Sequence, residues 1–224
     1  AIAKAVQIAK GEIIISSDAD CSFSPNWVRT MVSYFISDKV MLVSGPVSFH
    51  KQNGIFQSLQ ALEFISLIGS GAGAIGIRNA IFCNGANMAY RKSIFLEVND
   101  FATDKAVSGD DVFLLHSVKE RSPKSIAFAK NEDAIVTTEG VQSIKGFINQ
   151  RKRWTAKSSS YKDKRTIYTS FLVLFTNLSL LYLFVLCFFD SQFLNYFIGF
   201  YLLKFIIDLI FLIPILDFFK RKVL

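Results

Sequence analysis

The last quarter of the chain is dominated by two long apolar runs. Residues 170–189 carry no charged side chain, and residues 193–213 carry one cation and one anion, Lys204 and Asp208. Each run has about the 20 residues that a helix needs to cross the hydrocarbon core of a bilayer. A polar link of three residues, 190–192, separates them. The pattern therefore predicts a transmembrane hairpin, in which Lys204 and Asp208, four residues apart, form a mutual ion pair.

The first 140 residues show shorter and more varied patterns, in which β-branched apolar runs alternate with helical periodicity. Strands are expected at residues 12–17, 40–49, 81–91, 126–130 and 134–138. Helices are expected at residues 24–36, 55–68, 93–98, 109–120 and 141–157. This alternation predicts an α/β domain, with residues 12–17 as a buried parallel strand. The glycine-rich stretch 69–76 lacks the Lys-Ser/Thr ending of a P-loop and is expected to be a loop without a phosphate role.

Residues 1–10 have the pattern of an amphipathic helix that is already in progress, so the sequence is expected to be a fragment whose earlier strands are missing. Three parts are expected: an α/β domain at 1–140, a basic interfacial helix at 141–165 and a transmembrane hairpin at 166–224. No Cys/His spacing typical of a zinc site or a disulfide framework occurs.

The distribution of charged residues indicates where the protein is located. The 224 residues are 51% hydrophobic and carry a formal charge of +7, with cations concentrated at 145–165 and 220–222, on either side of the apolar runs. Cations that flank apolar spans mark the cytoplasmic side of a membrane. We therefore expect an integral membrane protein whose soluble part faces the cytoplasm, and no nucleic-acid partner.

Two pairs of acids are candidates for chemistry. Asp18 and Asp20 follow the first expected strand, and their spacing points both carboxylates to the same side, where Mg²⁺ or Mn²⁺ could be held together with phosphate oxygens. Acids at strand ends are also common for purely structural reasons. A phosphatase of the haloacid dehalogenase type also starts with Asp-x-Asp after a strand, but it fits poorly, because Ser22 follows Cys21 where that pattern expects a Thr or Val directly. Asp110 and Asp111 start a helix, where one acid can be a simple cap and a second exceeds what capping needs.

The basic helix carries the segment "QRKRW" at residues 150–154. The guanidinium groups of Arg151 and Arg153 match phosphate oxygens, and Trp154 offers a flat face for stacking. Taken alone, such a helix is most often a membrane-surface face. The two histidines, His50 and His116, are isolated and are expected to have packing or solvated roles.

Four segments in this order, "SSDAD", "CNGANMAYR", "SGDD" and "QRKRW", followed by paired spans, resemble the membrane-bound family 2 glycosyltransferases of the GT-A fold. That group includes cellulose, chitin and hyaluronan synthases and ceramide glucosyltransferase. The resemblance covers the chain from Gly11 to the end of the second span. It implies a GT-A-type mixed sheet followed by the interfacial helix and the two spans.

The resemblance also implies roles for individual residues. It makes Asp18 and Asp20 the metal site, Asp111 the general base with Asp110 beside it, and Asn84, Gly85 and Asn87 part of the acceptor site. Gln150, Arg151, Arg153 and Trp154 are implied to hold the donor diphosphate. The implied reaction is an inverting, metal-dependent transfer of a sugar from a nucleotide-diphosphate donor to a hydroxyl of a lipid or glycan acceptor.

"SGDD" replaces the family's more usual Thr-Glu-Asp, so either Asp110 or Asp111 can be the base. The upstream strands that hold the nucleoside in the family precede Ala1. Two other functions stay open: a processive polysaccharide synthase, disfavoured because two spans are fewer than a polymer channel uses, and a catalytically silent membrane scaffold.

Overall fold

The computed structural model describes residues 2–50, 54–98, 110–158 and 161–220, without the side chains of Asp110 and Lys157. The chain forms two compact units, Ala1–Tyr161 and Lys162–Leu224, each of which is described by itself.

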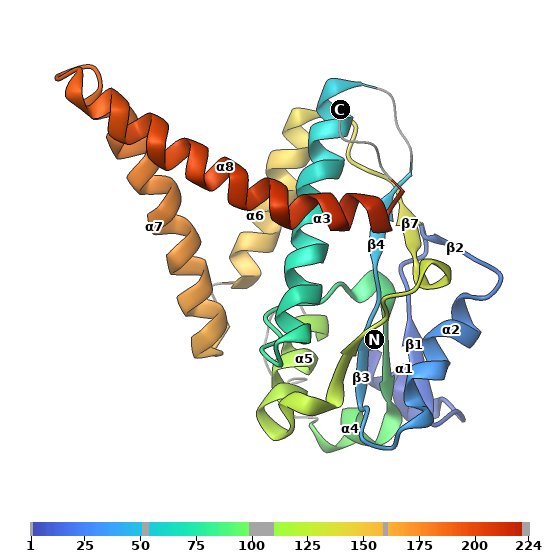
Figure 1. Ribbon diagram of the computed structural model, residues 1–224. Coiled ribbons are helices and arrows are strands. Elements are labelled where there is room, and N and C mark those ends of the chain that lie inside the picture. Colours follow the sequence, from blue (N-terminus) through green and yellow to red (C-terminus); the bar gives the residue numbers. More distant parts are fainter. Residues whose placement is uncertain (1, 51–53, 99–109, 159–160, 221–224) are drawn as a thin grey trace. The chain divides into compact units, whose positions relative to one another are not determined.

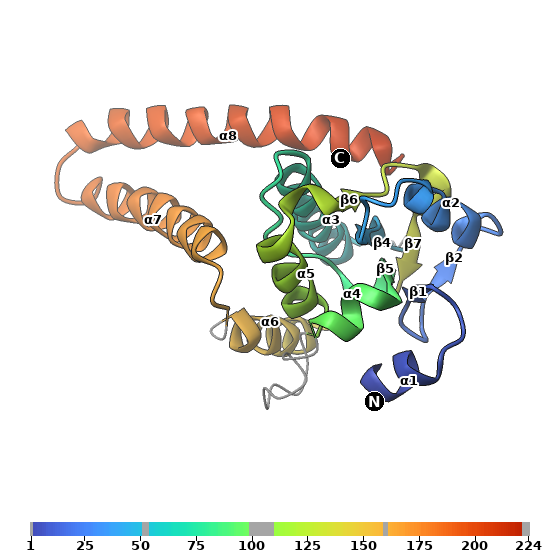
Figure 2. The same ribbon diagram turned by 90° about the horizontal axis from the view of Figure 1, so that it is seen from below.

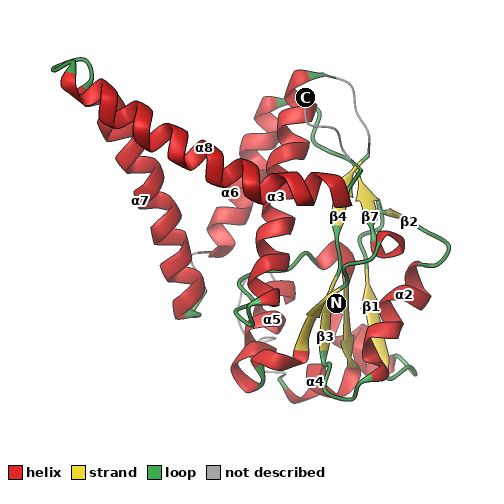
Figure 3. Ribbon diagram, in the orientation of Figure 1, coloured by secondary structure: helices red, strands yellow, loops and turns green. Residues whose placement is uncertain are grey.

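The first unit alternates short strands with helices (Figures 1 and 3). Its strands are β1 (Ile13–Ser16), β2 (Ser22–Phe23), β3 (Leu42–Ser44), β4 (Val47–Phe49), β5 (Met88–Arg91), β6 (Ile126–Phe128) and β7 (Val136–Thr138). Its α-helices are α1 (Ile2–Ile8), α2 (Trp27–Ser33), α3 (Ile55–Gly76), α4 (Lys92–Glu97), α5 (Asp110–Arg121) and α6 (Ile144–Ser158). Short 3₁₀ turns include η1 (Tyr34–Ile36), η2 (Gly85–Asn87), η4 (Pro123–Ser125) and η5 (Glu132–Ala134).

The strands form two mixed sheets, which confirms the predicted α/β class. The larger sheet has the order β1-β5-β3-β6, in which β5 runs antiparallel to both neighbours and β3 runs parallel to β6. The smaller sheet has the order β2-β7-β4, with β4 parallel to β7. The expectation of a buried parallel strand at 12–17 is wrong: β1 is half-buried, and its partner β5 is antiparallel.

Side chains of alternate parity cover the two faces of the larger sheet, as the pleat of a strand requires. On one face, Leu42 and Tyr90 pack with the apolar sides of α1, α4 and α5 and the end of α3. On the other face, Val43 and Ala89 pack against Trp27 and its neighbours from α2 and η1. The sheet is therefore enclosed between two helical layers, with α2 on the side opposite α5 (Figures 1 and 2).

The expected strand at 40–49 is divided into β3 and β4, which belong to different sheets. Gly45 and Pro46 lie between them. The backbone N–H of Gly45 donates to the carbonyl of Asn87 at 2.8 Å, and a Cβ on Gly45 would lie 2.3 Å from the Asn87 side chain. Only glycine permits this approach, and proline, which has no N–H to donate, ends the ladder there.

The expected loop at 69–76 is wrong, because these residues continue α3 to Gly76. Glycine lowers helix stability by about 1 kcal/mol per residue relative to alanine, so local propensity favours a loop. Packing overrides it: a Cβ on Gly71 would lie 3.2 Å from the ring and the carbonyl oxygen of Phe82, so the small residue allows α3 to approach that segment closely. The helix expected at 24–36 also begins later, at Trp27, with Asn26 as its N-cap.

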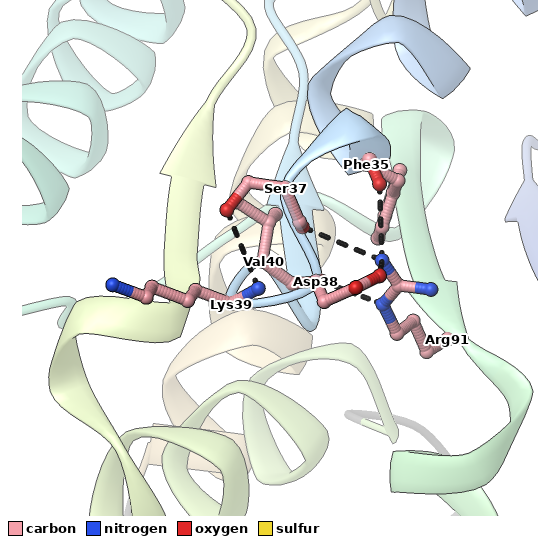
Figure 4. A network of polar contacts seen from close by, with 6 residues as sticks. All are labelled: Phe35, Ser37, Asp38, Lys39, Val40 and Arg91. Carbon is pink, nitrogen blue, oxygen red and sulfur yellow. Dashed lines mark hydrogen bonds and ion pairs between the residues drawn. The ribbon is translucent and has the colours of Figure 1, made fainter.

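The last residue of the "CNGANMAYR" segment holds the turn between η1 and β3 in place (Figure 4). Arg91 donates from Nε to the Val40 carbonyl at 3.0 Å and from Nη2 to the Phe35 carbonyl at 3.0 Å. Its Nη2 also lies 3.3 Å from the Asp38 carboxylate. Arg91 therefore serves the fold at this turn.

The second unit consists of α7 (Lys164–Leu186) and α8 (Gln192–Phe218). Their mean hydropathies over an 18-residue window are 2.0 and 2.2, and both are long and apolar enough to cross a membrane. Within α8, Lys204 forms an ion pair with Asp208 four residues later, as the spacing predicts. The hairpin expected from the two apolar runs is the arrangement that the structure shows for this unit.

Candidate active site

Three of the four sequence segments meet around one residue, Gly85. The Oγ of Ser16, the last residue of β1, donates to the carbonyls of Gly85 and Met88, each at 3.3 Å. The backbone N–H of Gly85 donates to Oδ2 of Asp111 at 2.9 Å. The end of β1, the turn η2 and the start of α5 are thereby joined by hydrogen bonds, although they lie far apart in the sequence.

Asp18 and Asp20 lie just past the end of β1, and both are exposed. Oδ2 of Asp20 accepts a hydrogen bond from Oγ1 of Thr138, at the end of β7, at 3.3 Å. The Asp18 carbonyl accepts from the N–H of Cys21 at 3.2 Å, which closes a tight turn around the two acids. The carboxylates are thus held on a short turn with solvent access.

Asp111 is half-buried in the first turn of α5. Its carbonyl accepts from the thiol of Cys83 at 3.4 Å. Burial, and after it the charge of Asp111, raises the pKa of the Cys83 thiol well above its usual value, so Cys83 stays neutral. The backbone of Asp110 begins α5, while its side chain lies outside the described part of the chain.

The two asparagines of "CNGAN" have different environments. Oδ1 of Asn84 accepts from the N–H of Ala86 at 3.0 Å, which caps the turn η2, and the residue is half-buried. Asn87 is 0% exposed, and its Nδ2 donates to the carbonyls of Pro46 and Ala134 at 2.8 and 2.7 Å. Its Oδ1 accepts from Nε1 of Trp27 at 3.0 Å. The polar atoms of Asn87 thus have partners inside the fold.

The "QRKRW" segment lies on α6, and its members divide into two sets. Arg151 forms an ion pair with Glu63 of α3, with its guanidinium carbon 4.6 Å from the centre of the Phe147 ring and 4.2 Å from that of Trp154. Trp154 is half-buried, with its ring 6.3 Å from that of Phe64 on α3. Gln150 has a buried Oε1 with no partner among the described residues, whereas Arg153 is exposed.

The segment that follows α6 packs on α5 near the acid. The ring of Tyr161 makes edge contacts with Phe113 at 5.8 Å and with His116 at 5.4 Å. Burial, with a smaller contribution from the charge of Asp111, raises the pKa of Tyr161 to about 12. His116 contacts the Ile81 carbonyl through Nε2 at 2.9 Å, in agreement with the packing role expected for it.

A model of one protein family, described as glycosyl transferase family group 2, matches residues 13–219. That match covers most of the chain and includes all four segments. The chain belongs to this family. The resemblance read from the sequence is thereby confirmed.

Solved structures of two glycosyltransferases match the chain more distantly. Glucosyl-3-phosphoglycerate synthase from Mycobacterium tuberculosis, solved in complex with Mn²⁺ and uridine-diphosphate-glucose, matches with 13% identity and a TM-score of 0.39, over 65% of this chain and 47% of that one. Mannosyl-3-phosphoglycerate synthase from Rubrobacter xylanophilus matches with 11% identity and a TM-score of 0.36, over 73% of this chain and 52% of that one. The chain thus spans about half the length of these proteins. No curated protein matches it.

The metal expected at Asp18 and Asp20 has two carboxylates to hold it. Within residues 2–50, 54–98, 110–158 and 161–220, no group of three or more His, Cys, Asp or Glu side chains could form a metal site. Mg²⁺ and Mn²⁺ are commonly bound by one or two carboxylates together with substrate phosphates, so this pair of exposed acids fits such an ion.

Sequence analysis did not identify three residues that contact the candidate site residues: Ser16, Thr138 and Glu63. Ser16 and Thr138 end strands and use their hydroxyls on other segments, which only the strand pairing reveals. Glu63 is the single charged residue of α3, and that isolation is the one signal that could have marked it.

Proposed function

We propose that this chain carries the catalytic core of an inverting glycosyltransferase. It moves a sugar from a nucleotide-diphosphate donor to a hydroxyl group of a lipid or glycan acceptor. The observation that carries the proposal is the junction at Gly85, where hydrogen bonds join Ser16 and Asp111 in a chain that belongs to glycosyl transferase family group 2.

Asp18 and Asp20 would hold Mg²⁺ or Mn²⁺ together with the donor diphosphate. The ion supplies positive charge that stabilises the negative charge of the departing nucleoside diphosphate. The fit rests on the exposure of both carboxylates and on the hydrogen bond from Thr138 that orients Asp20. Metal dependence is part of the proposal.

Asp111 is proposed as the general base. Its Oδ2 is fixed by the N–H of Gly85, and it lies at the start of a helix, where the helix dipole favours a negative charge. It takes the proton of the acceptor hydroxyl while that oxygen forms a bond to the anomeric carbon. The bond between the anomeric carbon and the diphosphate oxygen breaks on the opposite side, which inverts the configuration.

The remaining predicted residues divide by exposure. Asn84 and Gly85 border Asp111 and are proposed to line the acceptor site. Arg153 is exposed and can meet a diphosphate with its planar guanidinium, with Gln150 and Trp154 beside it on α6. Asn87 is proposed to act on the acceptor indirectly, because its buried amide positions the turn that carries Gly85.

We further propose that the first unit faces the cytoplasm, because cations flank α7 and α8 and the link at 190–192 has none. A cysteine at Ser191 should react with an impermeant thiol reagent added outside cells, and one at Ser158 should not, in a protein lacking Cys21 and Cys187. The reverse labelling would overturn this orientation.

The reaction itself is tested with the full-length protein in membranes, supplied with a panel of nucleotide sugars and a lipid extract. We expect release of nucleoside diphosphate from one donor class, dependent on Mn²⁺ or Mg²⁺ and lowered by about 10² to 10⁴ in Asp111→Asn. A protein that binds no nucleotide sugar and releases no diphosphate with any acceptor would support the scaffold instead.

A further inference from the structure

The basic helix α6 is attached to the α/β domain through α3. Glu63 of α3 forms the ion pair with Arg151, and two aromatic residues of α3 extend the contact on either side of it. Phe64 lies 6.3 Å from Trp154, and Phe56 lies 6.1 Å from Phe147 in an edge contact. These distances are between ring centres. We call this set of contacts the α3–α6 clasp.

Arg151 is enclosed in the clasp. Its side chain is 21% exposed, and its guanidinium lies close to both the Phe147 and Trp154 rings. Nη2 carries the contact with Glu63, while Nε and Nη1 are buried with no partner among the described residues. A guanidinium in contact with rings and a carboxylate has little freedom to turn toward another anion, since that would expose the rings and leave Glu63 unpaired.

Charge and burial oppose each other in this pair. Burial raises the pKa of Glu63, and the charge of Arg151 partly offsets that rise. Burial likewise lowers the pKa of Arg151, and the charge of Glu63 partly offsets it. Each charge therefore offsets part of the cost of burying the other. Removing either partner should therefore disturb the clasp about as much as removing both.

Arg151 and Arg153 lie two positions apart on α6, so their side chains leave the helix about 200° apart, in nearly opposite directions. The first is directed to α3, and the second is exposed. Of these two arginines in the segment, only Arg153 is presented to solvent in this arrangement.

We propose that Glu63 is a positioning residue: it fixes Arg151 within the α3–α6 clasp and so sets the rotation of α6 that presents Arg153 to the donor. The donor-binding role of α6 rests on the proposed function, and its attachment to α3 rests on the contacts of the α3–α6 clasp. It changes the role of Arg151 from a ligand of the diphosphate to the internal partner of Glu63.

The test measures binding of UDP, GDP and ADP, each with MnCl₂, to the full-length protein in lipid nanodiscs. Glu63→Gln should lower the affinity for the preferred diphosphate about 10-fold, the effect of losing one charged hydrogen bond. Glu63→Asp, which keeps the charge, should restore most of it. Arg151→Gln and the double variant Glu63→Gln/Arg151→Gln should fall within a few-fold of Glu63→Gln, because coupled partners are not additive.

The matched control is Glu97→Gln. Glu97 of α4 forms an ion pair with Arg121 of α5 at 3.2 Å, but both side chains are largely exposed, at 63% and 42%. This variant should bind like the wild type. Equal losses in Glu97→Gln and Glu63→Gln would overturn the proposal.

A second readout does not depend on nucleotide binding. The chain has two tryptophans, of which Trp27 is 6% exposed and Trp154 is half-buried. In Glu63→Gln, acrylamide should quench the fluorescence more strongly than in the wild type and the emission should shift to the red. Unchanged quenching would overturn the proposal even if the variant bound less diphosphate.

The two proposals fail in distinguishable ways. If the wild type binds none of the three diphosphates or their sugars, the proposed function fails, and the quenching experiment still decides whether Glu63 holds α6. If Glu63→Gln binds diphosphate more tightly than the wild type, Glu63 competes with the donor for Arg151, and the positioning role is wrong. If Arg151→Gln loses far more diphosphate affinity than Glu63→Gln, Arg151 binds the diphosphate directly. That result would also overturn the positioning role of Glu63.

Discussion

Two polar regions of the first unit place similar residues in opposite environments. One is the buried amide of Asn87 with its partners Trp27, Pro46 and Ala134, which we call the Asn87 knot. The other is the pair of exposed carboxylates Asp18 and Asp20, which we call the acidic turn. Both belong to segments shared with a glycosyltransferase family, and the resemblance alone treats both as binding residues.

The difference lies in what each side chain still has available. A buried amide with three hydrogen-bond partners presents no surface to a ligand. Breaking those hydrogen bonds to expose it costs free energy. The carboxylates of Asp18 and Asp20 are exposed, so a cation can reach them without opening the fold. Burial and hydrogen-bond partners therefore separate residues that build the site from residues that bind, and each of the following variants tests that separation.

The largest effect is expected for Asn87→Ala. It removes the hydrogen bonds of the Trp27 N–H and of the buried Ala134 carbonyl, while the Pro46 carbonyl keeps the N–H of Val136. Each of these two losses costs about 1–3 kcal/mol, so the unfolding free energy should fall by about 3 kcal/mol or more. Cys83 is buried, so its reaction with a thiol-specific fluorophore on heating reports the unfolding of this unit. Cys21 and Cys187 are replaced by serine in that experiment.

Asn84→Ala is the matched control for the knot, because it removes an asparagine from the same segment. It loses a single cap of the turn η2, for which about 1 kcal/mol is expected. Equal melting temperatures for the two variants would mean that the knot is no more important to the fold than a surface cap.

The next effect is expected for Asp111→Asn, at the junction between the two regions. Asparagine keeps an oxygen that can accept from the N–H of Gly85, so stability and donor affinity should persist. Turnover at saturating donor should fall by about 10² to 10⁴, the usual contribution of a general base. If Asp110→Asn loses turnover and Asp111→Asn does not, the base is the preceding residue.

Asp20→Asn should act on binding and leave the fold intact. Loss of one charged ligand should weaken the Mn²⁺-dependent affinity for nucleoside diphosphate about 10-fold or more, with no change in melting temperature, since Asp20 is exposed. Calorimetric titration with and without Mn²⁺ measures this. Glu120→Gln, which removes an exposed acid of α5, is the control for net charge. An Asp20 variant that melts early but binds normally would assign this acid to the fold.

The smallest effect is expected for Thr138→Val, which removes the hydroxyl that orients Asp20 and keeps the shape of the side chain. A single exposed hydrogen bond of 3.3 Å supports a loss of about 2- to 5-fold in Mn²⁺-dependent affinity. Thr137→Val is the neighbouring control, because its hydroxyl donates to the Ser22 carbonyl instead. Indistinguishable affinities in the two variants would show that Thr138 does not orient the acidic turn.

The sequence predicted the fold class and the second unit well, because apolar periodicity and length determine both. It missed the division of residues 40–49 into two strands, since the signal, Gly45-Pro46, acquires its meaning from the side chain of Asn87, far away in the sequence. It also missed the second half of α3, where tertiary contact at Gly71 outweighs the low helix propensity of a glycine-rich stretch.

The sequence indicated those residues of the candidate site that belong to recognisable motifs. It did not indicate the residues that act by orienting them. Asp18, Asp20 and Asp111 follow from resemblance and spacing. Thr138 orients Asp20, the N–H of Gly85 orients Asp111, and the hydroxyl of Ser16 donates to the Gly85 carbonyl. These partners come from strands and turns that are adjacent only after folding. The environment of Arg151 depends in the same way on Glu63, which no periodicity marks.

Helix α3 has a consequence for the number of membrane crossings. It has 22 residues and a mean hydropathy of 1.3 over an 18-residue window, so by length and composition it qualifies as a third crossing within the described part of the chain. A crossing there would place Asp18 and Arg153 in different compartments. The sheet forbids that division: β3 precedes α3 in the chain, β5 and β6 follow it, and β3 is hydrogen-bonded to both. A bilayer cannot separate strands that share a ladder. Every segment proposed to handle donor or acceptor, whether it precedes or follows α3, therefore lies in one compartment, and the crossings that hydropathy supports after it are α7 and α8, an even pair.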